Sequence, residues 1–234
     1  MFENQIILHR YMMRLVYFSV PGRAEASRIA LALSGFEWED VEVNGIEFNK
    51  MKDEGDLPWD MLPILQTSKG TIAESSAILR YAGKVAGLVP EDPYQAAKVD
   101  EFIDGMGPIA RAIDTTFIDD EDKKLKLRKQ LFEPDGAATK ALKMYDKKIE
   151  KSKKGWAADT DEMSIADLKL FTEVFGFFSG NYDGIEKHMI SGYKNLLKYH
   201  HKVANDKRIK NHYNEINPED IRWTFLPDAF SDLT

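Results

Sequence analysis

The stretch LVYFSVPGRAEASRIALALSGF, residues 15–36, decides how the chain begins to fold. A short apolar run, residues 15–18, predicts a strand, and Pro21 with Gly22 predicts a turn after it. Residues 24–33 are rich in alanine and repeat their apolar side chains at helical spacing. Residues 38–43 predict a second strand, because Val41 and Val43 would point to the same face. The stretch therefore predicts a β-α-β unit.

The following residues complete a small α/β domain. Residues 44–62 are polar and predict irregular chain, whereas residues 63–67 and 71–73 predict two short strands. Residues 74–87 predict a helix that ends at Gly87.

Beyond residue 87 the pattern changes to helical throughout. The segment LVPEDP, residues 88–93, has two prolines in six residues and is the best linker candidate. We expect helices or helix pairs over residues 94–116, 121–154, 165–178 and 192–213. The fold class expected is an α/β domain followed by an all-α domain. The boundaries expected are an N-terminal extension at 1–13, the α/β domain at 14–89 and the helical domain at 90–234.

The composition limits the possible partners. The chain has 234 residues, of which 43% are hydrophobic, and a formal net charge of −7. An acidic chain is a poor general ligand for nucleic acid or an anionic membrane, because both attract lysine and arginine. The chain has no cysteine, so a reaction at sulfur needs a sulfur from another molecule. No segment approaches the ~18 apolar residues of a membrane span, so we expect a cytoplasmic protein.

Several polar features have ordinary structural explanations. The Lys/Arg-rich runs at 123–129 and 147–154 are interleaved with apolar residues, which favours solvated helix faces over a polyanion site. The histidines lack the i, i+4 pairing of a helical zinc site, and we expect no metal. Ser164 and Asp167 have the spacing of a helix capping box.

Two positions in the α/β domain suggest a peptide ligand. Pro63 opens a strand after a long loop, where a cis peptide bond is often found. The backbone of Leu62 could then pair with an extended peptide as one more strand. Glu74 and Ser75 start the next helix, where a carboxylate and an ammonium of the same ligand could bind. Taken alone, however, these two residues are better explained as a helix cap.

Six short motifs follow one another along the chain: Tyr17-Phe18, Gly22-Arg23-Ala24-Glu25, Leu57-Pro58-Trp59, Leu62-Pro63-Ile64-Leu65, Glu74-Ser75-Ser76-Ala77-Ile78-Leu79-Arg80-Tyr81 and Met163-Ser164-Ile165-Ala166-Asp167. In this order they resemble the cytosolic glutathione S-transferases of the tyrosine type, and most of all the sigma class, which includes prostaglandin D synthases and S-crystallins. The resemblance implies a thioredoxin-like N-terminal domain that binds glutathione, an all-helical C-terminal domain and a homodimer. It implies conjugation of glutathione to small hydrophobic electrophiles, as in detoxification, with no metal required.

The resemblance also assigns roles around the first turn. A free thiol with a pKa of about 8.5 is mostly protonated at neutral pH, and lowering that pKa by about two units needs about 2.7 kcal/mol. Tyr17 would donate its hydroxyl hydrogen to the thiolate of glutathione. Arg23 would add positive potential.

The glutathione contacts implied by the resemblance lie in three segments. The backbone-pairing position and the cis proline match Leu62 and Pro63, and the pair that binds the γ-glutamyl group matches Glu74 and Ser75. At the glycine end, Phe48 and Lys52 match a tryptophan and a lysine of sigma-class enzymes.

Three residues depart from the family pattern. Asp60 stands where the family has glycine, and Met61 stands where it has lysine or glutamine. One contact to the glycyl carboxylate is therefore expected to be missing, with weaker glutathione binding as the result. Pro108 stands where the family has an acidic residue that reaches the partner subunit's glutathione, and Asp104 is a possible substitute.

The second substrate is not specified by the sequence. We expect its pocket to be built from residues 19–21 and 106–113 and from Trp223 and Phe225, which are mostly apolar. Two alternatives to conjugation stay open. The departures from the family pattern would suit a non-catalytic binding or structural protein, of the S-crystallin or ligandin kind, and a glutathione-dependent isomerase is the other possibility.

Overall fold

The computed structural model describes residues 12–233 of the chain. These residues divide into two compact units, and the division falls between Val89 and Pro90. Most of the extension expected at residues 1–13 lies outside the described residues. The first strand begins at Met13, the last residue of that expected extension.

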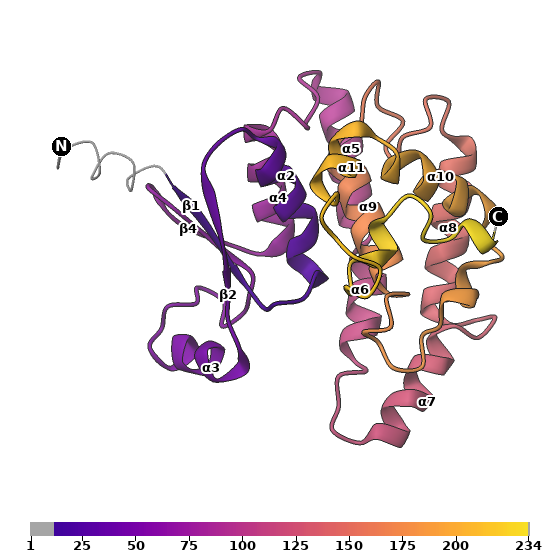
Figure 1. Ribbon diagram of the computed structural model, residues 1–234, viewed down its shortest axis with the longest axis horizontal. Helices are drawn as coiled ribbons and strands as arrows, with labels where there is room; N and C mark the ends of the chain where they lie inside the picture. Colours follow the sequence, from indigo (N-terminus) through magenta and orange to yellow (C-terminus); the bar gives the residue numbers. More distant parts are fainter. Residues whose placement is uncertain (1–11, 234) are drawn as a thin grey trace. The chain divides into compact units, whose positions relative to one another are not determined.

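The N-terminal unit is built on a four-stranded mixed sheet (Figure 1). The strands are β1 (Met13–Tyr17), β2 (Trp38–Glu42), β3 (Ile64–Thr67) and β4 (Gly70–Ala73), in the spatial order β2-β1-β3-β4. β1 runs parallel to β2, while β3 is antiparallel to both β1 and β4. The β-α-β unit predicted from residues 15–43 is confirmed.

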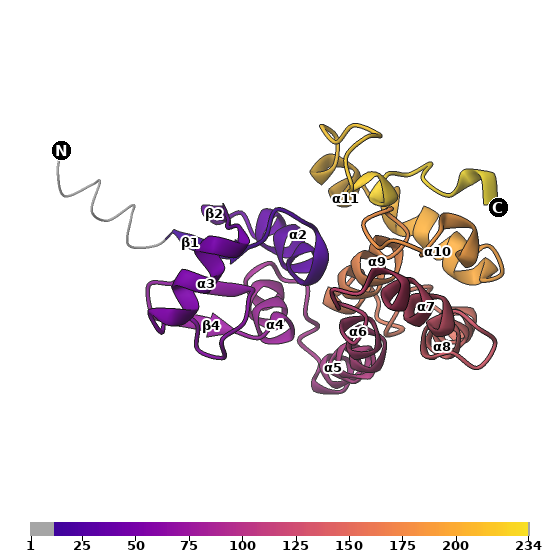
Figure 2. The ribbon, with the colours of Figure 1, turned by 90° about the horizontal axis from the view of Figure 1, so that it is seen from below.

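Helices cover this sheet. A short 3-10 turn, η1 (Gly22–Ala24), leads into α2 (Glu25–Leu33), which packs against α4 (Ser75–Val85). The two helices lie side by side in both ribbon views (Figures 1 and 2). Each presents an apolar face, and Ile29 of α2 and Ile78 of α4 are fully buried. This arrangement places the start of α2 next to the end of β1.

The prediction of irregular chain over residues 44–62 is wrong for its first half. α3 (Gly45–Asp53) is a helix with no fully buried residue, so it lacks the strong apolar stripe by which helices are recognised. Its first turn is held by a capping box in which Asn44 accepts hydrogen bonds from the N–H groups of Ile46 and Glu47. The side chain of Glu47 returns a bond to the N–H of Asn44 (2.7 Å). Local capping therefore defines the start of this helix.

The C-terminal unit is helical, as predicted. Its main helices are α5 (Pro93–Gly105), α6 (Gly107–Asp114), α7 (Glu121–Leu131), α8 (Ala137–Lys151), α9 (Ile165–Gly176), α10 (Lys194–Ala204) and α11 (Lys207–His212). A short 3-10 turn, η2 (Lys187–Ile190), lies between α9 and α10, and two more, η3 (Trp223–Phe225) and η4 (Ser231–Leu233), follow α11. α9 is buried along most of its length and packs against α5, α10 and η3. None of the helices among residues 12–233 has the length and apolar character that a bilayer crossing requires.

The capping box predicted at Ser164 and Asp167 is confirmed, and it does more than start α9. Asp167 is fully buried, and its carboxylate accepts hydrogen bonds from the Ser164 N–H (2.8 Å) and the Ala157 N–H (2.7 Å). The Tyr199 hydroxyl donates a third bond (2.8 Å). One carboxylate thus joins the loop before α9, the start of α9 and the middle of α10.

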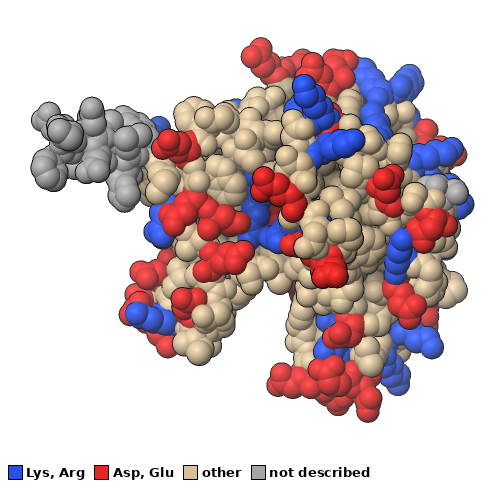
Figure 3. Space-filling model, in the orientation of Figure 1, with Lys and Arg blue, Asp and Glu red and all other residues tan. Residues whose placement is uncertain are grey.

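The lysine-rich segments are mostly solvated helix faces, but Arg128 departs from this pattern. On the face of the helical unit that Figure 3 shows, basic and acidic side chains are intermixed. Arg128 of α7 is only 2% exposed, although its position in the run predicts a solvated residue. Its guanidinium donates to Thr116 (3.2 Å) and to the carbonyl oxygen of Asp183 (3.1 Å), and it lies over the ring of Phe117. These partners are distant in sequence, so the local pattern could not reveal them.

His200 lies inside an aromatic cluster of the helical unit. Its ring contacts those of Phe175 (4.5 Å between centroids) and Phe230 (4.9 Å), and its Nε2 donates to the carbonyl oxygen of Thr224 (2.7 Å). Burial lowers the pKa of His200 from 6.5 to about 4. The folded protein therefore keeps this imidazole neutral at pH values where the unfolded chain binds a proton.

We predict that His200 makes stability fall in mild acid. Because the folded pKa lies below the unfolded one, the stabilisation is complete above about pH 6.5 and is lost as pH falls toward 4, by about 3 kcal/mol. Denaturant unfolding between pH 7 and 4 measures this slope, and His200→Phe should flatten it. His188→Gln, at an exposed histidine, is the control and should keep the wild-type slope. An equal slope in the wild type and in His200→Phe would contradict the assignment.

Candidate functional site

The first candidate residue, Tyr17, is the last residue of β1 and is buried. The backbone N–H of Arg23 donates to its hydroxyl oxygen (3.3 Å). A hydroxyl that accepts a hydrogen bond through its oxygen can also donate one through its hydrogen. The turn therefore brings the backbone of Arg23 to the tyrosine hydroxyl. The Arg23 side chain is exposed.

Gly22 allows the turn to approach the tyrosine this closely. Its φ is +42°, in the region that favours glycine. A Cβ atom at this position would lie 2.8 Å from the Tyr17 hydroxyl oxygen, which is closer than real Cβ contacts come. A larger residue would therefore displace either the turn or the hydroxyl.

Arg28 holds the loop between Tyr17 and α2, and sequence analysis missed it. Its side chain is 4% exposed, and its guanidinium donates to the carbonyl oxygens of Phe18 (3.2 Å), Val20 (2.8 Å) and Pro21 (3.2 Å). The guanidinium carbon lies 5.8 Å from the centroid of the Tyr17 ring. One side chain thus satisfies three carbonyl groups of the loop that follows the tyrosine. The available signal was a charged residue within an otherwise apolar helical run.

Two carboxylates neutralise this buried cation. Nη1 of Arg28 lies 3.1 Å from Glu25, which is 1% exposed, and its Nε lies 2.8 Å from Asp40 in β2. Burial alone would lower the pKa of Arg28, but the charges of Glu25 and Asp40 raise it above its ordinary value. The arginine therefore stays charged inside the N-terminal unit.

The second candidate segment lies at the start of α4. Glu74 immediately precedes the helix with φ +71° and ψ +116°, and Ser75 is the first helical residue. A non-glycine residue in such a conformation costs about 1–3 kcal/mol, which is typical of positions held for binding. The first N–H groups of α4 have no partner within the helix and can bind an anion. The arrangement suits the charged end of an amino-acid ligand.

The third candidate segment leads into β3. The Leu62–Pro63 peptide bond is cis, as expected. The backbone N–H and C=O of Leu62 make no hydrogen bond with any residue from 12 to 233. Asp60 has a φ of +52°, a conformation that glycine adopts freely and aspartate tolerates. Met61 is 53% exposed and offers no charge.

Phe48 and Lys52 both lie on α3, in different environments. The Phe48 ring packs against Phe18 (5.6 Å between centroids) and joins the apolar cluster around Val16 and Ile64. Lys52 is exposed in the last turn of the helix. Phe48 therefore has a packing role between α3 and the sheet, whatever else it does.

The expected apolar pocket residues of the C-terminal unit belong mostly to its core. Ile109 and Ile113 of α6 are buried, and so is Met106 at its start. Phe225 is 1% exposed and stacks on Tyr213 (5.3 Å between centroids). These four side chains are covered in the structure, and the expected pocket stays a prediction. Within residues 12–233, no three His, Asp or Glu side chains gather as a metal site would require.

Comparisons with known proteins match both units. The family model "Glutathione S-transferase, N-terminal domain" matches residues 13–84, and the corresponding C-terminal domain model matches residues 109–215. A glutathione S-transferase of Plasmodium falciparum is 30% identical over 206 residues, which cover 85% of this chain and 93% of the relative. The hematopoietic prostaglandin D synthase of Gallus gallus is 34% identical over 91 residues, 39% of this chain and 45% of the relative. The solved structure of monomeric Na-GST-3 from Necator americanus has a TM-score of 0.72 at 25% identity, covering 89% of this chain and 98% of that one.

We predict that Arg28→Met lowers the free energy of unfolding by about 3–5 kcal/mol, because it leaves the buried carboxylate of Glu25 without its countercharge. Arg14→Met is the matched control. Its ion pair with Glu39 is nearly half exposed, and its loss should cost at most about 1 kcal/mol. Chemical denaturation of the three proteins gives the comparison. Equal losses for the two variants would show that the Arg28 network does not hold the loop.

Proposed function

This chain belongs to the glutathione S-transferase family, and we propose that it activates glutathione through Tyr17 and conjugates it to hydrophobic electrophiles. The observation that carries the proposal is the environment of the Tyr17 hydroxyl. Tyr17 is buried at the end of β1, and its hydroxyl oxygen accepts a backbone hydrogen bond that helps to fix the hydroxyl in place. A donor fixed in this way stabilises an anion that forms beside it.

The chemistry follows from that donor. The thiol of glutathione loses its proton to solvent, and the Tyr17 hydroxyl donates to the thiolate that remains. Lowering the thiol pKa from about 8.5 by about two units requires about 2.7 kcal/mol, which is within reach of a charge-assisted hydrogen bond in a site with little water. The thiolate then forms a carbon–sulfur bond with the electrophile, and the electron pair leaves with a leaving group or is protonated on the acceptor. Arg23 adds positive potential near this sulfur.

The proposed glutathione site uses the three segments described above. The cysteinyl part pairs with the backbone of Leu62, which precedes Pro63. The Leu62 backbone makes no competing hydrogen bond among residues 12–233. The γ-glutamyl part binds at the start of α4, with its ammonium on Glu74 and its carboxylate on Ser75 and the helix N–H groups.

The glycine end of the proposed site is weaker. Lys52 supplies the one positive charge assigned to the glycyl carboxylate, and Phe48 lies one turn before Lys52 on α3. Met61 supplies no charge. We therefore propose that glutathione binds less tightly here than in a protein that has a lysine or glutamine at position 61.

A second candidate function is a glutathione-dependent isomerisation. The similarity to a prostaglandin D synthase supports it, over 91 residues at 34% identity. The two functions share the glutathione thiolate that Tyr17 stabilises, and they differ in the fate of the carbon–sulfur bond, which an isomerase breaks again. Product analysis with candidate substrates distinguishes them.

Tyr17→Phe tests the thiolate directly. We expect bound glutathione to show thiolate absorbance near 240 nm at neutral pH in the wild type and not in the variant. Turnover of an aryl halide at neutral pH should fall about 10–100-fold, because the thiol pKa returns toward its free value. Tyr94→Phe, at a tyrosine that is 71% exposed, is the control and should behave as the wild type.

Two results would contradict the proposal. One is that glutathione fails to bind, and the other is that its thiol pKa is unshifted in both proteins. Either result would favour a non-catalytic binding or structural role.

We also propose that the protein is a homodimer in the cytosol. Trp59 is 66% exposed and Tyr81 36% exposed in the N-terminal unit, and large apolar side chains of this kind are frequently covered by a partner. The Necator americanus protein is described as monomeric, so the assembly needs a direct measurement.

We predict that Trp59→Glu converts a dimer into a monomer, because it introduces a charge into an apolar contact. Light scattering coupled to size-exclusion chromatography measures the mass. Lys69→Glu, at an exposed polar residue of the same unit, is the control and should remain dimeric. A wild-type protein of monomeric mass would overturn the proposed assembly, and a dimeric Trp59→Glu would exclude Trp59 from its interface.

A further inference from the structure

Helix α3 begins at the only asparagine of the sequence that is followed by glycine, Asn44-Gly45. Both residues are exposed. In such a pair the backbone nitrogen of the glycine can attack the amide carbon of the asparagine side chain, because glycine has no Cβ atom to hinder ring closure. The other asparagines of the chain precede larger residues. This cyclisation is therefore concentrated at Asn44.

The surroundings of Gly45 leave room for the ring that this attack forms. Beyond the neighbouring residues and the backbone of its own helix, a Cβ atom at Gly45 would meet no other atom within 4 Å. The N–H group of Gly45 makes no hydrogen bond with any residue from 12 to 233, because it belongs to the first turn of the helix. The attacking nitrogen is therefore open to solvent base and has no hydrogen bond to break.

The capping box of α3 opposes the reaction, because it binds the side chain that must rotate. Oδ1 of Asn44 accepts hydrogen bonds from the N–H groups of Ile46 (2.8 Å) and Glu47 (3.1 Å). The Glu47 carboxylate accepts a bond from the Asn44 N–H (2.7 Å). Ring closure turns the Asn44 amide carbon toward the Gly45 nitrogen and breaks the bonds to Oδ1. The reaction therefore proceeds from molecules in which the first turn of α3 is open.

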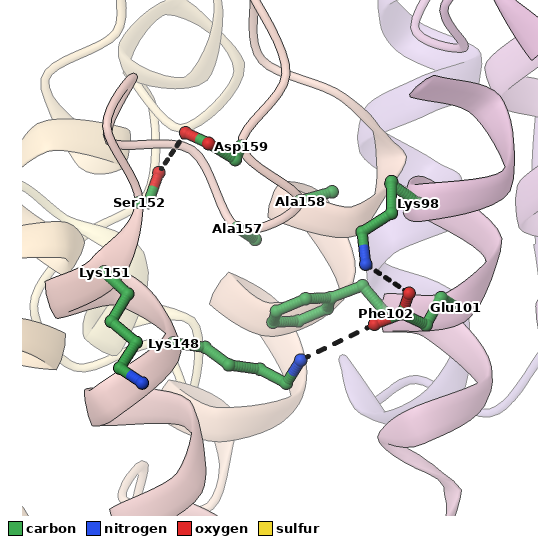
Figure 4. A pocket seen from close by; sticks show the side chains of 9 residues that line it. All are labelled: Lys98, Glu101, Phe102, Lys148, Lys151, Ser152, Ala157, Ala158 and Asp159. Carbon is green, nitrogen blue, oxygen red and sulfur yellow. Dashed lines mark hydrogen bonds and ion pairs between the residues drawn. The ribbon is translucent and has the colours of Figure 1, made fainter. Parts of the chain in front are cut away.

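Few contacts hold this first turn in place. α3 has no fully buried residue. Among residues 12–233, the side chains of Asn44 and Glu47 form hydrogen bonds only within the same turn. In the helical unit, by contrast, Lys148 of α8 is joined to α5 through its ion pair with Glu101 (Figure 4). Local opening of the first turn of α3 needs little free energy, because few contacts are lost.

We propose that Asn44 is a site of spontaneous deamidation and that the capping box of α3 sets its rate. The Gly45 nitrogen forms a bond to Cγ of Asn44, the Cγ–Nδ2 bond breaks, and the amide nitrogen leaves as ammonia with the proton that Gly45 gives up. Water then opens the resulting succinimide at one of its two carbonyl carbons. Opening at Cγ gives aspartate. Opening at the main-chain carbonyl carbon gives isoaspartate, in which the main chain runs through the former side chain.

The two products have different effects on α3. Aspartate caps a helix as well as asparagine does, and its charge is favourable at the positive end of the helix dipole. Isoaspartate lengthens the main chain by one carbon, so the capping bonds with Ile46 and Glu47 cannot re-form in the same geometry. Phe48 and Lys52 lie on this helix, so isoaspartate also weakens the glycine end of the glutathione site. That last consequence rests on the proposed function, whereas the deamidation itself does not.

Mass spectrometry of the folded protein after incubation in mildly alkaline buffer tests the proposal. We expect the mass gain of deamidation at Asn44, located by fragmentation of the peptide that contains it, and an isoaspartate fraction that an isoaspartate methyltransferase labels. Gly45→Ala should slow the gain about tenfold, because a Cβ atom hinders ring closure. Gly192→Ala, at a glycine outside α3 that is equally free of close contacts, is the control and should keep the wild-type rate.

Glu47→Ala tests the control of the rate by the capping box. It removes the acceptor of the Asn44 N–H, so the first turn opens more often and deamidation should be about threefold to fivefold faster. Glu47→Gln keeps an acceptor at this position and should react within about twofold of the wild type.

Two results would overturn the proposal. One is an unchanged mass at Asn44 in the folded protein after a free peptide of residues 41–48 has reacted completely. The other is an equal rate in the wild type and Glu47→Ala. Neither measurement uses glutathione, so both are independent of the outcome of Tyr17→Phe.

Discussion

The buried ion pair between Arg28 and Glu25 is the constraint on which the candidate site depends. An arginine with a nearly covered side chain requires counter-charge and hydrogen-bond acceptors, because burial of an unpaired cation costs several kcal/mol. Glu25 and Asp40 supply the charge, and the carbonyl groups of the loop after Tyr17 supply the acceptors. These contacts favour one backbone conformation of the loop. In that conformation, the N–H of Arg23 donates to the Tyr17 hydroxyl.

Backbone groups account for much of what the site can do. The hydroxyl of Tyr17 is oriented by an N–H group, the Leu62 backbone has no partner among residues 12–233, and α4 begins with N–H groups that need an acceptor. An acidic chain can bind an anionic tripeptide in this way, because oriented dipoles act at short range and do not depend on net charge. The strained backbone at Glu74 belongs to the same arrangement.

The helical unit is organised by a different buried group. Asp167 accepts hydrogen bonds from three segments and so connects the loop after α8, α9 and α10. Next to α9, aromatic rings from the C-terminal segment surround His200 and keep it neutral. In each unit, a few buried polar groups thus fix the positions of neighbouring segments more exactly than apolar packing alone would.

Patterns that depend on near neighbours were readable from the sequence by itself. The β-α-β unit, the helical second half and the Ser164–Asp167 capping box are local, because strand alternation, helical spacing and caps involve residues only a few positions apart. The order of the short motifs along the chain also allowed the family to be predicted from the sequence. α3 was missed because its first turn is defined by a cap and no stripe of buried side chains marks it.

Only the tertiary structure decided the partners of the buried charges and the accessibility of the aromatic residues. Arg28 reaches Asp40 across 12 positions, and Arg128 reaches Asp183 across 55. Phe225, expected to line a pocket, lies in the core beside Tyr213. Contacts at such separations form when secondary structures pack, and the side chains that make them look locally like ordinary surface or pocket residues. Burial is a property of the assembled fold, and no short stretch of sequence contains it.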